Sequence, residues 1–471
     1  MASVAVIGAG VGGLGTALAL SRAGHDVVIV ERDRTPLPRS ADEAFDWDRR
    51  GAPQVRHSHA LLARLRNILR DRYPDVLAAL FEAGATEWRL LDRLPDTLDD
   101  TAPRPGDEDL VMLACRRTTF EWVLRRTVLA APHVELRDGA VVEGLLGSPG
   151  SPPTVTGARL ADGATIDADI VVAANGRRGD VPAWLAAVGV SVPETVEDTG
   201  IVYLSRFYRL RDGASVPEQL GPIGGDLGYL KYATIIGDNR TFSVTFAVPT
   251  DDRELRALLL DPTQFEAVAR ALPATSEWVS SARADPITPV EVMARLLNRL
   301  RRFTDHDGSP RVLGFHAVGD AHTCTNPLYG RGCSLAMVQA TLLADALAEA
   351  PNDALARARL YEDGSAREVE PWYGAAVAAD SDAKRGPSSD ESDPRAFMRV
   401  LLREGLLPAM RTDATVLRAF VRTFNLLTPP DAILRDSDVI GRVLNVYNDR
   451  ENRPPEPSLG PTTRADLLAA L

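Results

Sequence analysis

The amino-acid sequence predicts an α/β protein with three parts: a Rossmann-like nucleotide-binding domain, a second domain built on a β-sheet, and a C-terminal helical region. Three observations lead to this prediction. An apolar strand at the start of the chain ends in a glycine-rich turn, strand-like runs recur through the middle, and the last part is mostly helical in pattern. A chain of 471 residues also exceeds one ordinary core, so several structural units are expected.

The opening of the chain has the pattern of a βαβ unit. Residues 4–7 are an apolar run that ends in glycines, residues 14–21 are the small and apolar residues of a buried helix, and residues 27–30 are a second buried strand that ends at Glu31. A strand, a tight turn, a helix and a strand within about 30 residues are typical of a parallel sheet.

The middle of the chain changes to strand-like patterns. Residues 134–174 contain short alternating runs separated by Asp-Gly and Pro-Gly turns, which predict an antiparallel meander that returns into the main sheet at residues 170–173. Further strand-like runs occupy residues 200–249, and we expect helical segments over residues 252–300.

Late in the chain, residues 312–319 are another apolar strand, which leads into a long helix over residues 333–350. The first domain is therefore expected to be discontinuous. The predicted division assigns residues 1–75, 110–190 and 310–350 to the nucleotide-binding domain, residues 76–109 and 191–309 to a substrate-binding domain, and residues 351–471 to the C-terminal helical region.

The overall charge and the apolar pattern exclude several function classes. The formal net charge is −12, whereas nucleic-acid and anionic-membrane surfaces need clustered Lys and Arg, so neither partner is expected. No apolar run reaches the roughly 18 residues that would span a bilayer, and no basic segment precedes the first strand, so we expect a cytoplasmic protein without an integral membrane segment. The three cysteines show no Cys-x-x-Cys spacing, and we predict no metal site.

The glycine-rich turn after the first strand has the spacing of a dinucleotide site. Gly8, Gly10 and Gly13 provide a tight turn, close approach of the backbone to a pyrophosphate, and close packing of helix on strand. Glu31 lies 23 residues after Gly8, near the spacing of about 20 expected for an acid that binds a ribose hydroxyl. The turn alone does not distinguish NAD from FAD.

A second glycine-rich block follows the late strand. Asp320 stands at the strand end, where an acid can bind a ribityl chain or the water network around a phosphate. Residues 326–334 then read Asn-Pro-Leu-Tyr-Gly-Arg-Gly-Cys-Ser and enter a helix. Such an entry offers backbone N–H groups to the N1–C2=O edge of a flavin, where negative charge collects on reduction. This block favours FAD.

These two blocks, together with residues 169–176, resemble those of the flavoprotein monooxygenases that share the para-hydroxybenzoate hydroxylase fold. The resemblance is anchored over about residues 1–190 and 310–350, and it implies that the nucleotide-binding domain binds FAD. It further implies roles for five positions: Glu31 on the adenosine ribose, Asp320 on the ribityl–phosphate region, and Pro327, Gly330 and Gly332 along the isoalloxazine.

Two further blocks narrow the resemblance. Residues 51–61 resemble a segment of bacterial FAD epoxidase-like enzymes, which implies that Gln54 and Arg56 approach the flavin. The helix that starts at Arg117 is similar to one whose arginine pairs with the FAD pyrophosphate, and a guanidinium fork suits a diphosphate. Together these blocks look like the squalene-epoxidase-like branch, including the epoxidases of polyether ionophore biosynthesis of the monensin and lasalocid type.

His57 and His59 invite interpretation as a metal pair. Side chains two residues apart on a helix point in different directions, however, and no third ligand stands nearby in the sequence. A position near the cofactor or at a helix cap is the preferred interpretation of His57. The full set of predicted cofactor-binding residues is Gly8, Gly10, Val11, Gly12, Gly13, Glu31, Arg32, Gln54, Arg56, His57, Arg117, Gly319, Asp320, Pro327, Gly330, Arg331, Gly332 and Cys333.

One block departs from the family pattern. Many members carry Asp-Gly where this chain has Asn175 and Gly176, followed by Arg177 and Arg178. Asn can still hydrogen-bond but carries no charge, and no second glycine fingerprint is evident. The electron source is therefore left open between NAD(P)H and a separate flavin reductase.

The resemblance implies an FAD-dependent monooxygenase, in which reduced FAD adds O₂ at its C4a carbon and the hydroperoxide passes one oxygen to a lipophilic substrate. The favoured reaction is epoxidation of an alkene in a polyene, polyketide or terpenoid of antibiotic-type secondary metabolism. An electron-rich alkene attacks the distal oxygen directly, so we assign no catalytic acid or base. The alternatives are an aromatic (phenol) hydroxylase, a non-enzymatic redox flavoprotein, and a flavin-dependent halogenase, which is disfavoured because no Trp-x-Trp-x-Ile-Pro signature occurs.

Overall fold

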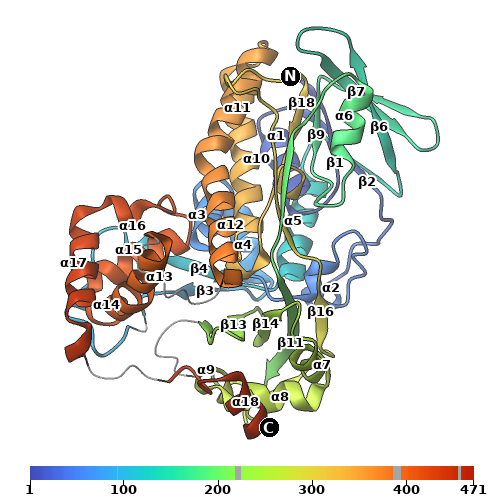
Figure 1. Ribbon diagram of the computed structural model, residues 1–471. Coiled ribbons are helices and arrows are strands. Elements are labelled where there is room, and N and C mark those ends of the chain that lie inside the picture. The colour runs from blue at the N-terminus through green and yellow to red at the C-terminus, as the bar shows by residue number, and fades with distance from the viewer. Residues whose placement is uncertain (93, 218–223, 386–393, 454–457) are drawn as a thin grey trace.

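The computed structural model describes residues 1–92, 94–217, 224–385, 394–453 and 458–471 (Figure 1). A five-stranded sheet forms the centre of its first unit. The strands are β1 (Ser3–Ile7), β2 (Asp26–Glu31), β5 (Val134–Asp138), β9 (Ile170–Ala173) and β18 (Phe315–Ala317), in the order β18-β9-β1-β2-β5. Every adjacent pair is parallel. The carboxyl ends of the strands therefore meet at one edge, and the predicted α/β architecture is confirmed.

Alternate residues of β1 face two different cores. Val4 and Val6 pack in a cluster with helices α1 (Val11–Arg22), α5 (Arg117–Ala130) and α10 (Gly332–Glu349). Ala5 and Ile7 pack instead with α6 (Val181–Ala187) and with the antiparallel sheet of β6 (Val142–Ser148), β7 (Thr154–Leu160) and β8 (Thr165–Asp167). In Figure 1 the helices lie on one side of the parallel sheet and β6 and β7 on the other.

Helices α3 (Ala63–Arg72) and α4 (Pro74–Glu82) extend the first core. Leu65 and Leu69 of α3 and Val76 and Leu80 of α4 are all buried in the cluster that contains α1 and α10. The predicted domain boundary at residue 76 thus falls within one packed pair of helices. The hairpin of β3 (Thr86–Arg89) and β4 (Val111–Ala114) follows.

A six-stranded antiparallel sheet forms the second unit. Its strands are β11 (Ile201–Leu210), β12 (Gly224–Asp226), β13 (Lys231–Ile236), β14 (Thr241–Pro249), β15 (Ala284–Pro286) and β16 (Glu291–Met293), in the order β12-β13-β14-β11-β15, with β16 also paired to β11. Its core includes Phe246, Phe265 and Trp278, which join the sheet to α7 (Arg253–Leu260), α8 (Pro262–Ala271) and α9 (Pro273–Ser276).

The helical prediction for residues 252–300 is correct only in part. The helices end at Ser276, and the remainder forms β15, β16 and β17 (Leu297–Arg301). β17 lies between β10 (Glu194–Asp198) and β19 (Thr323–Cys324). Strands this short carry little periodicity of their own, and they are stabilised by partners far away in the sequence, so a local pattern does not reveal them.

The C-terminal region is helical, as predicted, but its helices join several cores. Helix α11 (Ala354–Glu368) packs on α10, and its Tyr361 belongs to the first core. Helix α12 (Glu370–Arg385) packs on β17 and β19 of the three-stranded sheet β10-β17-β19. The segment from α13 (Pro394–Leu401) to α17 (Ser437–Asn448) has its own apolar cluster. The last helix, α18 (Arg464–Ala470), packs on α8 of the second unit, on the side away from the parallel sheet (Figure 1). Among the described helices, none combines the length and the apolar character needed to cross a membrane.

The close packing of Gly13 against Gly8 in the first glycine-rich turn gives a prediction for stability. A Cβ added at Gly13 would lie 1.9 Å from the carbonyl oxygen of Gly8, so G13A must displace backbone and should destabilise the protein by at least about 2 kcal/mol. Gly374 on the exposed side of α12 is the matched control, because a Cβ there meets no described atom within 4 Å. We expect G374A to leave the thermal midpoint unchanged or to raise it. Equal midpoints for the two variants would contradict the close packing.

Candidate functional site

The glycine-rich turn leaves the amino end of α1 open. Gly8 has a φ of +105°, and a Cβ there would lie 2.7 Å from the carbonyl oxygen of Ala174. Gly10 is the N-cap of α1, a Cβ on it meets no described atom within 4 Å, and no side chain of the described residues caps the helix. The first N–H groups of a helix have no intrahelical partner and carry partial positive charge. The turn can therefore accept an anion.

Glu31 lies at the end of β2 and is buried against this turn. One carboxylate oxygen accepts a 2.7 Å hydrogen bond from the N–H of Ala9, and the other accepts a 2.9 Å bond from the N–H of Asp33. The neighbouring Arg32 has a largely exposed side chain with only a 3.5 Å contact to Asp33. Glu31 thus lies at the strand end beside the turn, whereas Arg32 faces solvent.

A buried ion cluster joins the turn to two helices. Arg49 donates to the carbonyl oxygen of Ala9 at 3.0 Å and contacts Glu121 of α5 at 2.6 Å. Arg117, also on α5, contacts the other oxygen of Glu121 at 2.9 Å and reaches Sγ of Cys333 at 2.9 Å. Cys333 is at the start of α10. The cluster therefore brings the first turn, α5 and the late glycine-rich block into contact.

The same cluster contains a third buried guanidinium group. Arg125, one helical turn beyond Glu121 on α5, is 2% exposed, and its guanidinium lies 5.3 Å from the ring centre of Trp47, as that of Arg49 does at 5.0 Å. Nη1 of Arg49 and both Nε and Nη1 of Arg125 are buried, and no hydrogen-bond partner for them occurs in the described part of the chain. Two guanidinium groups thus contact the carboxylate of Glu121 directly, and the third retains free nitrogens.

Two pKa shifts reflect the burial and the charges of this cluster. Burial alone would raise the pKa of Glu121, but the guanidinium groups of Arg49 and Arg117 outweigh burial and hold the pKa below its ordinary value. Burial lowers the pKa of Arg125 and the cation of Arg49 lowers it further, although nearby carboxylates such as Glu31 act to raise it. An unsatisfied buried cation is costly, so the cluster is suited to an anionic ligand such as a diphosphate.

Only Arg117 of these residues is among the predicted site residues. Arg49, Glu121 and Arg125 were missed, although one signal was available. Arg117, Glu121 and Arg125 follow one another at intervals of four residues, which places all three on one face of a helix. Arg49 has no such pattern, because it stands in a loop.

The late block begins beside the same cluster. The N–H of Gly319 donates to Oε1 of Gln339 at 2.7 Å, which ties the strand end to α10. Burial raises the pKa of Asp320, although Arg177, Arg117 and Arg299 all act to lower it. The pKa of Asp320 therefore responds both to Arg117 of the buried cluster and to arginines outside it.

The loop between Asp320 and α10 is held by a buried carboxylate from α12. Asp380 accepts hydrogen bonds from Nδ2 of Asn298 at 2.7 Å, from Nδ2 of Asn326 at 2.8 Å and from the hydroxyl of Tyr329 at 3.0 Å. Asn326 also donates its backbone N–H to Asn298 at 2.7 Å. The loop that contains Pro327 is therefore anchored at both ends of its short 3-10 turn.

The glycines of this loop differ in their surroundings. Gly330 has a φ of +65°, and a Cβ there would lie 2.8 Å from Cβ of Ala60, whereas a Cβ on Gly332 meets no described atom within 4 Å. Arg331 lies between the rings of Tyr329 and Trp372, at 4.6 Å from each ring centre, and burial lowers its pKa to about 10. Gly332 thus offers an open backbone surface at the start of α10.

The residues of the block 51–61 face the second unit. Gln54 and Arg56 lie on a short 3-10 helix (Pro53–Arg56) and are half-buried. Nδ1 of His57 is 3.1 Å from Oγ of Ser205 on β11, and Nδ1 of His59 is 3.0 Å from the carbonyl oxygen of His57. Both imidazoles therefore bond to protein groups. Buried hydroxyl groups continue the chain of contacts across β11 and β14 through Ser58, Ser243 and Thr245.

Comparison with known proteins supports the fold. Residues 6–68 match the family model of an NAD(P)-binding Rossmann-like domain. No curated protein matches the chain in sequence. Among solved structures, the chain is similar to PqsL of Pseudomonas aeruginosa, described as a probable FAD-dependent monooxygenase, with a TM-score of 0.57 and 19% identity over 82% of this chain and 98% of PqsL.

Two halogenating enzymes are similar to the same degree. The flavin-dependent brominase Bmp2 matches with a TM-score of 0.60 and 16% identity over 95% of this chain and 98% of Bmp2. CmlS, a flavin-dependent halogenase, matches with a TM-score of 0.58 and 19% identity over 87% of this chain and 72% of CmlS. At these identities the likeness shows a common fold, which flavin-dependent enzymes of different chemistry share.

The buried His57 gives a prediction for stability against pH. Burial lowers the pKa of His57 from 6.5 to about 4, so between these values the unfolded chain binds the proton more tightly than the folded protein does. The free energy of unfolding should therefore fall as the pH drops from 7 to 5, with a share of about 2 kcal/mol from this group. Urea unfolding at the two pH values gives the change in unfolding free energy, and we expect this change to be smaller in H57N than in the wild type by about that amount. H306N, at an exposed histidine, is the control and should keep the wild-type difference. If the change between pH 7 and pH 5 is as large in H57N as in the wild type, His57 is not responsible for it.

Proposed function

We propose that the protein is an FAD-dependent monooxygenase. The observation that carries the proposal is the buried cluster of Arg49, Arg117, Arg125 and Glu121, whose guanidinium groups keep unpaired nitrogens at the open amino end of α1. Its unpaired guanidinium atoms and the uncapped N–H groups fit the diphosphate of a dinucleotide. The common fold with flavin-dependent enzymes supports FAD as that dinucleotide.

The remaining groups of FAD have candidate partners along the same edge of the sheet. Glu31 would hold the adenosine ribose, Asp320 the ribityl chain, and the open backbone at Gly332 the pyrimidine edge of the isoalloxazine. Gln54 and Arg56 are proposed to approach the flavin from the side of the second unit. FAD, when bound and reduced by NAD(P)H or by a separate flavin reductase, supplies the activation of O₂ and the transfer of one oxygen atom.

The protein's own part is to exclude water and to aim the substrate. Leu328 of the anchored loop packs against an apolar group of Tyr203, Ala247 and Leu296, with Met293 beside them. An apolar surface beside the anchored loop suits a lipophilic substrate better than a charged one. We therefore propose epoxidation of an alkene in a polyene, polyketide or terpenoid, and we assign no catalytic acid or base, because an alkene needs none.

The binding of FAD can be tested with two neighbouring arginines. Arg125 is buried in the cluster, whereas Arg126 is exposed and lies over the ring of Trp122 at 4.6 Å. We expect R125Q to weaken FAD binding at least tenfold, in titrations followed by flavin fluorescence, because a charge-assisted contact contributes about 1.5–3 kcal/mol. R126Q should bind FAD as the wild type does. Purified wild-type protein that neither carries nor takes up flavin would refute the assignment.

The reaction is tested by oxygen consumption of the FAD-loaded, reduced protein. A lipophilic polyene should stimulate consumption and yield a product with one added oxygen atom and no peroxide release. Stimulation by phenols alone would assign an aromatic hydroxylase, and a halogenated product in the presence of halide would assign a halogenase. Flavin binding without any substrate-stimulated consumption would make the protein a redox flavoprotein that is not an oxygenase.

A further inference from the structure

Arg331, the residue before α10, has a guanidinium group whose hydrogen-bonding capacity is unused. Its Nε and Nη1 atoms are buried, and neither has a hydrogen-bond partner among the described residues. The group lies between the rings of Tyr329 and Trp372, at 4.6 Å from each ring centre. Two aromatic faces stabilise the cation but satisfy none of its N–H donors. Buried donors without partners are costly, so this group calls for a ligand with acceptor atoms.

The side chain of Arg331 turns towards α12 rather than towards the proposed flavin site. Trp372 is on α12, and the hydroxyl group of Tyr329 donates to Asp380 of the same helix at 3.0 Å. The flavin is proposed to meet the backbone at Gly332, where a Cβ meets no described atom within 4 Å. The guanidinium group and the backbone thus serve different directions, and a ligand other than FAD is expected at the guanidinium group.

A second buried polar group lies beside the same residues. The hydroxyl group of Tyr203 on β11 is buried, and it too has no hydrogen-bond partner in the described part of the chain. Burial raises the pKa of Tyr203 well above its ordinary value, and Tyr329 and Asp380 raise it further. The same two residues act to raise the pKa of Arg331 against the effect of burial. Tyr203 and Arg331 therefore both lie near the Tyr329–Asp380 pair, and Tyr203 keeps its proton for donation.

Apolar side chains surround both polar groups. Tyr203 belongs to the apolar group against which Leu328 packs. Trp372 belongs to a second apolar cluster, and the partly buried rings of Trp88 and Phe424 pack against it. The part of a ligand that adjoins its polar end is therefore expected to be apolar.

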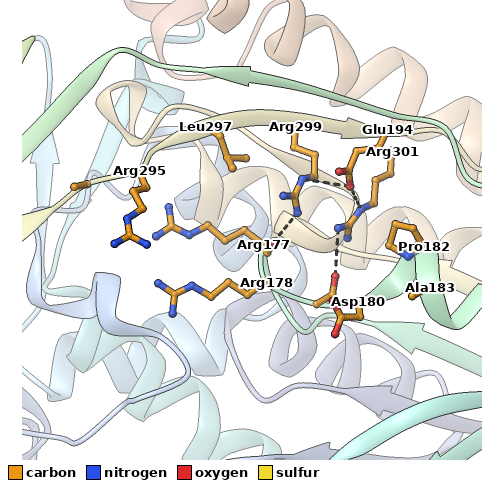
Figure 2. A pocket seen from close by; sticks show the side chains of 12 residues that line it. Arg177, Arg178, Asp180, Pro182, Ala183, Glu194, Arg295, Leu297, Arg299 and Arg301 are labelled. Atoms are coloured by element: carbon orange, nitrogen blue, oxygen red, sulfur yellow. Dashed lines mark hydrogen bonds and ion pairs between the residues drawn. The ribbon is translucent and has the colours of Figure 1, made fainter. Parts of the chain in front are cut away.

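Arg331 is distinct from the arginines of the largest described cavity. That cavity, of about 910 Å³, lies between the loop after β9 and the strand β17 (Figure 2). Arg299 and Arg301 contact Glu194 there, at 3.3 and 2.7 Å. Neither Arg331 nor Tyr203 lines it, so the two regions are separate.

We propose that Arg331 and Tyr203 bind the carboxylate of a lipophilic substrate, such as a polyene or terpenoid acid. The inference rests on the proposed monooxygenase function, because it specifies the substrate of that reaction. A guanidinium group has only donors, so its ligand must offer acceptor oxygens, and a carboxylate does so with a matching charge. The hydroxyl group of Tyr203 supplies a further donor. The negative charge of Asp380 nearby disfavours a doubly charged ligand such as a phosphate monoester.

The test compares a lipophilic acid with its neutral ester, by equilibrium dialysis against the FAD-loaded protein. The probes are cis-parinaric acid, a conjugated polyene fatty acid, and its methyl ester. We expect the wild type to bind the acid at least about tenfold more tightly than the ester, because hydrogen bonds to an ionised group are the stronger ones. R331Q should bind the acid as weakly as the ester, with its affinity for the ester unchanged. R331K keeps the charge and should retain part of the preference.

Two further variants sharpen the comparison. Y203F should bind the acid about threefold or more weakly than the wild type does, because one donor is lost. It keeps the proposal testable if R331Q does not fold. R450Q is the matched control, since Arg450 also lies over a tyrosine ring, at 4.4 Å from the ring centre of Tyr447, but is exposed beyond α17. R450Q should bind both probes as the wild type does.

Equal binding of the acid and the ester by the wild type, or no binding of either, overturns the proposal. So does an equal loss of both probes in R331Q, which would assign Arg331 to packing. A loss of FAD in R331Q, with the preference for the acid retained, overturns it as well. If the wild type takes up no flavin, the proposed monooxygenase fails, but a preference for the acid that R331Q abolishes still supports this site, so the two proposals fail independently.

Discussion

The carboxylate of Glu121 accepts contacts from Arg49 and Arg117, which come from a loop and from its own helix, and it does so in complete burial. Removal of one member of a buried ion pair typically destabilises a protein by about 3–5 kcal/mol, because the partner is left charged without compensation. A third buried cation, Arg125, lies beside this pair, and two of its guanidinium nitrogens have no hydrogen-bond partner in the described part of the chain. The rest of the site is organised around these buried guanidinium groups, whose free nitrogens an anion would satisfy.

The parallel sheet explains why the cluster and the late loop meet. In the order β18-β9-β1-β2-β5, the end of β18 is only one strand removed from the end of β1, although 310 residues separate them in the sequence. The contact of Arg117 on α5 with Cys333 on α10 joins residues that are 216 positions apart in the sequence. Asp380 then anchors the loop from outside, through Asn298, Asn326 and Tyr329. A helix of the C-terminal region thus determines the shape of the loop proposed to lie on the flavin.

Net charge and local charge have opposite signs in this protein. The chain carries a formal −12, yet the cluster at α1 is rich in arginine. The same holds for the cavity between the loop after β9 and the strand β17, which is lined by Arg177, Arg178, Arg295, Arg299 and Arg301. Acidic residues elsewhere on the surface account for the total and favour solubility, whereas the field at the site depends on which side chains are nearby. An anionic ligand is therefore attracted at short range despite the overall charge.

The sequence by itself determined the features that depend on neighbours along the chain. The first βαβ unit, the tight turn at Gly8, the acid at Glu31 and the helix entry after Asp320 all follow from local patterns, because each involves residues within one or two elements. Tertiary structure alone decided the rest. Arg49 contacts Glu121 although 72 residues separate them, and Arg178 and Arg295 line one cavity although they are more than 100 residues apart. The short strands β15 to β17 pair with β11 and β10. Such pairings leave no periodic signal, because they depend on how whole elements pack rather than on the spacing of residues within them.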